Sequence, residues 1–112
     1  MDINASEYID VDTALKRVGG NMDLFKRLLG RFVAGNNFEA LDNALKGGDS
    51  EESARLAHTL KGVSSNLSLD KVAALSASIE QLIKGGADYT ACLEELRQAY
   101  DVTVAKIAEM TS

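Results

Sequence analysis

Three Gly-Gly pairs divide the chain into four stretches, and each stretch carries apolar residues at helical spacing. The pairs are Gly19-Gly20, Gly47-Gly48 and Gly85-Gly86. Glycine enters the left-handed conformation that ends many helices without steric cost, so a glycine pair between apolar repeats indicates a helix end. The chain has no proline and only 5% aromatic residues, which favours helices over strands throughout.

The first two stretches predict a short helix followed by a longer helical region. We predict the short helix at about residues 10–18, and Asn21 is placed to cap the helix that follows it. Between residues 22 and 46 the apolar repeat changes phase at Gly35-Asn36-Asn37. At about 100° per residue, the two apolar faces point in nearly opposite directions. This predicts a kink or a break, and both one bent helix and two separate helices fit the pattern.

The remaining stretches predict three amphipathic helices. Asp49 followed by Glu52 resembles a capping box, which predicts a helix at about residues 50–67. Further apolar repeats predict a helix from residue 70 to the third glycine pair and a last helix at about residues 87–110. The 112 residues suffice for one core, so we predict a single all-α domain over residues 1–112. Its predicted architecture is an up-down antiparallel four-helix bundle with an additional short N-terminal helix.

Charge and composition exclude several classes of function. Twelve Lys and Arg against 17 Asp and Glu give a net charge of -5, which disfavours nucleic acids and anionic membranes as partners. One cysteine and one histidine provide neither a disulfide nor a cluster of zinc ligands. The first seven residues lack the pattern of a signal peptide, and no apolar run approaches the ~20 residues that span a bilayer. We therefore expect a soluble cytoplasmic protein without a metal site.

His58 lies on the polar side of the helix predicted at residues 50–67. The apolar residues expected to face the core are Leu56, Leu60, Val63 and Leu67. At about 100° per residue, His58 points the other way. Its neighbours on that face are small or polar: Glu51, Ala54, Arg55, Lys61, Gly62 and Ser65. An exposed imidazole with the ordinary histidine pKa of about 6.5 has a large neutral fraction at pH 7 and can act as a nucleophile.

Two neighbours of His58 suit a phosphoryl group on its ring, although each also has a structural interpretation. Gly62 costs roughly 1 kcal/mol relative to alanine in a helix interior; it leaves space for a partner, or it is a tolerated weak point or a close helix contact. Lys61 lies one turn from His58, so its ammonium could neutralise a phosphoryl group, as could Arg55. Arg55 could instead pair with Glu51, and a lone exposed histidine can lack any role.

The segment Ala57-His58-Thr59-Leu60-Lys61-Gly62 resembles the His-x-x-Lys-Gly signature of histidine-containing phosphotransfer (HPt) domains. The similarity continues upstream in residues 12–20, 28–32 and 44–49 and downstream in residues 66–67 and 75–80, so it covers about residues 8–85. The last helix matches only in its amphipathic pattern. One departure is Ser68, where many members of the family have glycine after the histidine helix; a serine there could cap the next helix.

The resemblance implies a function in two-component phosphorelays. His58 would accept a phosphoryl group from the phospho-aspartate of a receiver domain, or from a sensor kinase, and pass it to the aspartate of a response regulator. Lys61 would stabilise the phosphoryl charge, and Gly62 would leave steric clearance. The residues expected to contact the partner are Ala54, Arg55 and Ser65. The chain would be a phosphocarrier rather than an enzyme, with no cofactor of its own, and the Mg²⁺ ion would belong to the receiver partner.

The implied partners are the receiver domains of a response regulator or of a hybrid sensor histidine kinase. We expect a monomer, with pairing of the long helices into a dimer as the alternative. The competing interpretation is a non-catalytic helical adaptor that binds a receiver domain or another partner without carrying phosphate. Metal or haem binding through His58 lacks a second ligand at suitable spacing.

Overall fold

The computed structural model describes residues 8–111, and its defined elements in that range are all helices. They are α2 (Val11–Arg17), α3 (Met22–Gly35), α4 (Asn37–Lys46), α5 (Ser50–Asn66), α6 (Asp70–Lys84) and α7 (Thr90–Thr111). The all-helical prediction is confirmed. Residues 1–7, in which the sequence indicates no signal peptide, and residue 112 lie outside the described range.

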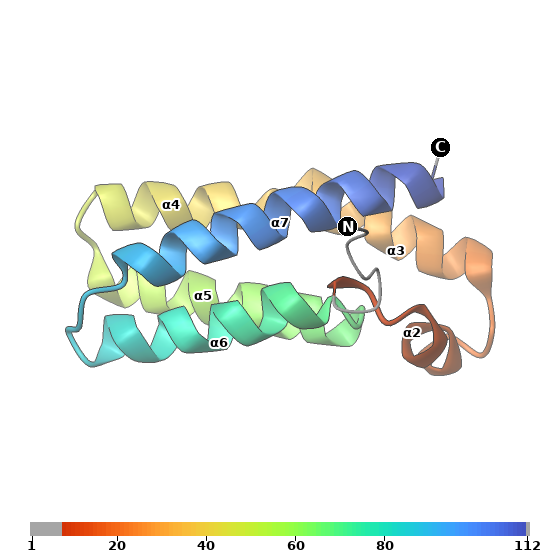
Figure 1. Ribbon diagram of the computed structural model, residues 1–112, viewed down its shortest axis with the longest axis horizontal. Coiled ribbons are helices and arrows are strands. Elements are labelled where there is room, and N and C mark those ends of the chain that lie inside the picture. The colour runs from red at the N-terminus through yellow and green to blue at the C-terminus, as the bar shows by residue number, and fades with distance from the viewer. Residues whose placement is uncertain (1–7, 112) are drawn as a thin grey trace, which may run out of the picture.

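The long helices lie side by side along the length of the molecule (Figure 1). α5 packs against α4 and α6, and α7 packs against α6 and α3. Figure 1 shows that α3 and α4 run in one direction, α5 returns, α6 reverses again and α7 returns once more. α2 lies at one end of the molecule, in contact with α3. Within residues 8–111, no helix is long and apolar enough to cross a membrane.

The region between residues 22 and 46 is broken at Asn36 into two helices rather than bent as one. Asn36 adopts the left-handed conformation, with φ of 47°, and its N–H donates to the Val33 carbonyl at 3.2 Å. Phe32 before the break and Phe38 after it both contact Tyr100 of α7, at centroid distances of 5.6 and 5.5 Å. The break therefore lets two apolar faces of different phase pack on the same helix.

Glycine pairs end three helical regions, as predicted. The second glycine of each pair has a positive φ, in which a side chain would be strained: 80° at Gly20, 75° at Gly48 and 68° at Gly86. Asn21 also caps α3 as predicted, because its side-chain oxygen accepts a hydrogen bond from the N–H of Leu24 at 3.0 Å.

α5 begins after Asp49, whose carboxylate accepts a hydrogen bond from the N–H of Glu52 at 3.0 Å. The predicted reciprocal bond of a capping box is wrong. The N–H of Asp49 donates instead to the Ala44 carbonyl at 3.2 Å, and the Glu52 carboxylate pairs with Arg55. The turn from α4 thus satisfies the N–H group that Glu52 was expected to bind.

The buried side of α5 differs from the apolar face predicted for it. Its buried residues are Ser53, Ala57, Leu60 and Ser64. The other residues expected in the core, Leu56, Val63 and Leu67, are only partly buried. α5 makes its most extensive contact with α6, and most of the buried side chains of α5 are small, which suits close packing of helices. The prediction followed the largest residues, whereas the position of α6 decides which line of α5 is buried.

Ser68 lies in the turn between α5 and α6 and does not cap α6, contrary to the prediction. Its φ is 57°, its carbonyl accepts a hydrogen bond from the N–H of Asp10 at 2.9 Å, and its buried hydroxyl has no hydrogen-bond partner. The N-cap position of α6 is Leu69. Glycine adopts this left-handed conformation without strain, so a glycine would fit this position better than serine does.

Candidate functional site

His58 lies in the middle of α5 and points away from the core. Ala57 and Leu60, on either side of it along the chain, are fully buried, whereas the His58 side chain is 65% exposed. The helical phase explains the difference, because successive residues are rotated by about 100° around the axis. α5 is therefore anchored along one side and presents the imidazole on the other.

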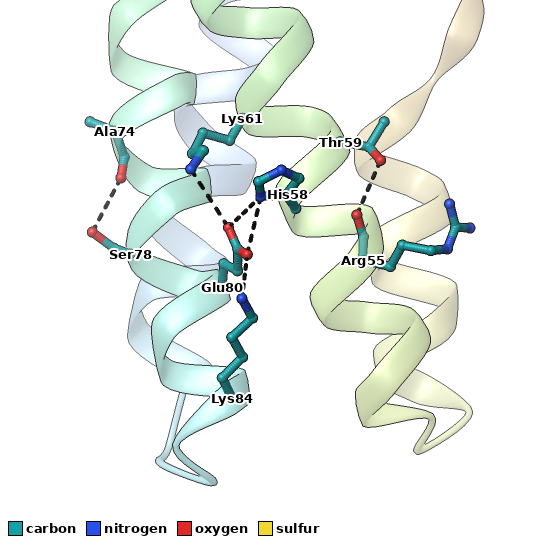
Figure 2. A network of polar contacts seen from close by, with 8 residues as sticks. All are labelled: Arg55, His58, Thr59, Lys61, Ala74, Ser78, Glu80 and Lys84. Carbon is teal, nitrogen blue, oxygen red and sulfur yellow. Dashed lines mark hydrogen bonds and ion pairs between the residues drawn. The ribbon is translucent and has the colours of Figure 1, made fainter.

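The Nδ1 atom of His58 contacts a buried carboxylate, that of Glu80 on α6. Nδ1 lies 3.3 Å from Oε1 and 3.2 Å from Oε2, and the Glu80 side chain is only 5% exposed. Figure 2 shows the carboxylate between the two helices, with the imidazole directed toward it from α5. The contact joins residues that are 22 positions apart in the chain, so it depends on how α5 and α6 pack.

Two lysines also reach the Glu80 carboxylate. The Nζ atom of Lys84 lies 2.9 Å from Oε2, and the Nζ atom of Lys61 lies 4.0 Å from Oε1. The hydrogen bond from Lys84 is the main reason why the pKa of Glu80 lies below its ordinary value of 4.5; the contact with His58 lowers it further, and burial opposes both. Glu80 is therefore ionised at neutral pH.

The ionised state of Glu80 determines which nitrogen of His58 carries the proton. A carboxylate only accepts hydrogen bonds, so Nδ1 must be the donor. In the neutral imidazole the proton then resides on Nδ1, and Nε2 keeps its lone pair. Figure 2 shows the second ring nitrogen on the side away from Glu80. The arrangement thus leaves Nε2 as the nucleophilic atom of an exposed side chain.

Gly62 lies one turn beyond His58 on the same exposed side of α5. Apart from its chain neighbours and the nearby backbone of α5, a Cβ atom built at Gly62 would have no heavy atom within 4 Å, so packing against the rest of the chain does not require a glycine here. Of the structural interpretations, a close helix contact is thereby excluded for the described residues. The missing side chain instead leaves free space on the surface of α5 beside the imidazole.

The three residues predicted to contact a partner do not all lie together. Ala54 and Arg55 line, with His58 and Glu80, a shallow hollow of about 580 Å³ between α5 and α6. Arg55 forms its ion pair with Glu52, not with Glu51 as the alternative interpretation had it. Ser65 is exposed further along α5, outside the residues that line this hollow.

The backbone carbonyl of Ser65 accepts a hydrogen bond from the Arg17 side chain of α2. This bond connects the short N-terminal helix to the C-terminal turn of α5, where carbonyl groups lack helical partners and attract cations. Among residues 8–111, no group of three or more His, Cys, Asp or Glu side chains could hold a metal ion.

A comparison with protein-family models matches residues 33–106 to the Hpt domain. The chain belongs to the Hpt domain family. The match begins within α3 and ends within α7, so it reaches further into the last helix than the residue-by-residue resemblance and does not include residues 8–32. It contains His58, Lys61, Gly62 and Glu80. Comparisons with curated proteins and with solved structures gave no significant match.

Hpt domains are phosphocarriers that interact with receiver domains in phosphorelays. Two residues of this site in the Hpt domain, Glu80 and Lys84, were not predicted from the sequence. The structure buries Glu80 with Val72, Ile79 and Ile83, where a charged group requires a partner, but the helical phase of the apolar residues places it beside their face rather than within it. Nothing in the sequence marked Lys84 beyond its place one turn after Glu80.

Proposed function

We propose that this Hpt domain accepts a phosphoryl group on Nε2 of His58 from a receiver-domain phospho-aspartate, or from a sensor kinase, and relays it to a response-regulator aspartate. The observation that carries the proposal is the contact between Nδ1 of His58 and the buried Glu80 carboxylate, at 3.2 and 3.3 Å. It supports the tautomer with its proton on Nδ1, in which the lone pair of the neutral imidazole lies on the exposed nitrogen. A histidine without a role would need no such partner.

The transfer makes one bond and breaks one. The lone pair of Nε2 forms the N–P bond while the P–O bond to the receiver's aspartate breaks, and the electron pair of that bond leaves with the carboxylate. The proton on Nδ1 stays in place, so the ring gains a positive charge, which the Glu80 carboxylate stabilises. The Mg²⁺ ion of the receiver would neutralise charge on the transferring group, and this chain supplies no cofactor of its own.

Lys61 is the cation that we assign to the phosphoryl group. Its side chain is 38% exposed and its ammonium is 4.0 Å from Glu80, a loose contact from which it can turn toward Nε2. Gly62 gives the receiver domain clearance beside the ring, and Ala54, Arg55 and Ser65 extend the docking surface along α5. In this proposal the domain is a monomeric, cytoplasmic up-down four-helix bundle, in which α3 and α4 together occupy one position.

The test is phosphoryl uptake by the full chain from a phosphorylated receiver domain and from a small phosphodonor. We expect acid-labile, alkali-stable phosphate on the wild type and none on His58→Gln. The variant should keep its helical circular-dichroism spectrum, because residue 58 is exposed. A folded wild type that takes up no phosphate from several donors but still binds a receiver domain would contradict the proposal in favour of the non-catalytic adaptor.

A further inference from the structure

Lys84 makes the shorter of the two lysine contacts with Glu80, yet it lies outside the His-x-x-Lys-Gly segment. Its Nζ atom is 2.9 Å from Oε2, against 4.0 Å between Lys61 and Oε1. Figure 2 shows the two ammonium groups reaching the carboxylate from opposite sides, with Lys61 on the side of the imidazole and Lys84 further along α6. Each lysine thus has its own carboxylate oxygen.

The two lysines differ in how they are anchored. Lys84 is on the same helix as Glu80, four residues later, a spacing at which opposite charges meet without any movement of the backbone. Lys61 comes from α5 and is held more loosely. A carboxylate that is 5% exposed must keep a cationic partner, because an unpaired buried charge is strongly destabilising. The imidazole becomes positively charged only as the N–P bond forms, so before that step Lys61 can leave Glu80 without stranding its charge only if Lys84 stays.

We propose that Lys84 is a positioning residue for phosphoryl transfer: it remains paired with Glu80 and thereby releases Lys61 to bind the phosphoryl group on His58. This inference rests on the proposed function of His58. Phosphorylation brings about two negative charges to Nε2, which attract Lys61 away from Glu80. With Lys84 in place, that movement leaves the carboxylate compensated and still able to accept the hydrogen bond from Nδ1.

Few other charged groups face Glu80. α5 contributes His58 and Lys61, and α6 contributes Lys84. Arg55 and Glu51 line the same hollow but make no ion pair with Glu80. Among the residues that the structure describes, α7, which packs on α6, makes no hydrogen bond or ion pair with this carboxylate. Removing Lys84 should therefore leave Lys61 as its single lysine partner.

The experiment is a double-mutant cycle on the full chain, with phosphorylation by a receiver domain and by a small phosphodonor as readouts. We expect Lys84→Met to slow uptake about fivefold, the scale of one partly exposed ion pair, and Lys84→Arg to restore it. In a Glu80→Gln background, Lys84→Met should have an effect of less than about twofold, because the amide needs no cationic partner and does not hold Lys61. The control is Lys71→Met, which removes an exposed lysine from the start of α6.

A second readout follows the Glu80 carboxyl group by ¹³C NMR. Lys84→Met should move its titration to higher pH, and Lys71→Met should not. The inference is overturned if wild type is labelled but Lys84→Met is labelled equally fast, if Lys84→Met slows uptake equally with and without the Glu80 carboxylate, or if Lys71→Met slows it as much. A wild type that takes up no phosphate overturns the proposed function itself, which distinguishes that failure from the failure of the role of Lys84.

Discussion

At His58, the choice of the reactive nitrogen depends on one buried carboxylate from another helix. Glu80→Gln replaces this carboxylate by an amide, which can donate as well as accept a hydrogen bond. The variant should show a mixture of imidazole tautomers in ¹⁵N NMR and phosphoryl uptake slowed by about tenfold or more, because a misplaced ring proton removes the nucleophilic lone pair. The matched control is Glu95→Gln on the exposed side of α7. Unchanged tautomers with a normal rate would contradict the role of Glu80.

Ser68 is a second residue whose role depends on its local conformation. Its φ of 57° and its buried, unpaired hydroxyl both cost stability. Ser68→Gly should therefore raise the free energy of unfolding by about 1 kcal/mol, because glycine adopts this conformation without strain. Urea denaturation followed by circular dichroism measures the change. Ser78→Gly, at an exposed position within α6, should have the opposite sign.

These residues mark the boundary of what the sequence could predict about the site. His58, Lys61 and Gly62 lie on one helix, so the phase of that helix alone placed them on its polar side. Glu80 and Lys84 come from the next helix, and their distance from His58 depends on the register between α5 and α6. No local pattern encodes that register. The unusual φ of Ser68 was equally hidden, because it follows from the geometry of the turn.

The helix that carries His58 depends on its cap. The Asp49 carboxylate accepts the N–H of Glu52 at 3.0 Å, and Asp49→Ala removes this bond from the first turn of α5. We expect the free energy of unfolding to fall by about 1 kcal/mol, the usual contribution of an N-cap. Asp101→Ala, on the exposed side of α7, should change it by less than about 0.5 kcal/mol. Equal losses in both variants, measured by urea denaturation, would show that the cap contributes nothing specific.

At Gly62, the same helix is expected to be less stable than it could be, because glycine leaves room for a receiver domain to approach His58. Gly62→Ala should raise the free energy of unfolding by up to about 1 kcal/mol, because the new methyl group meets no atom within 4 Å beyond its neighbours in α5 and alanine favours the helix. Uptake from a receiver domain should nevertheless slow, while uptake from a small donor stays unchanged. Gly30→Ala in α3 is the matched control, since its Cβ also meets nothing. Faster or equal uptake from the receiver would contradict the clearance role of Gly62.

Helix ends were predictable because their signals are local, whereas the packing of helices was not. Asn21, Asp49 and the glycine pairs act through hydrogen bonds and dihedral angles within a few residues, and the structure places the helix boundaries there. The phase change near Asn36 predicted an interruption without choosing between its forms. The contacts of Phe32 and Phe38 with a single tyrosine of α7 explain why two helices form. Whether one bent helix or two helices form is therefore decided by tertiary packing.

For the whole molecule, the charges around Glu80 connect the pairing of α5 and α6 to pH. The pKa of Glu80 is lowered in the folded state, mainly by the hydrogen bond from Lys84. The folded protein therefore stabilises the ionised carboxylate more than the unfolded chain does. This contribution to stability is fully present above the ordinary carboxyl pKa of 4.5 and is lost as the pH falls through the lower folded value. The urea concentration at the midpoint of unfolding should therefore decrease as the pH is lowered from neutral to about 3.

Glu80→Gln should make this acid dependence shallower, because the amide does not titrate. It should not abolish the dependence, since the pKa values of Asp10 and Asp88 are also lowered, mainly by hydrogen bonds from Thr13 and Thr90. Asp10→Asn therefore serves as the comparison: it tests a carboxylate that caps α2 rather than one between α5 and α6. If Glu80→Gln and the wild type lose stability equally on acidification, the buried carboxylate does not couple the packing of the two helices to pH.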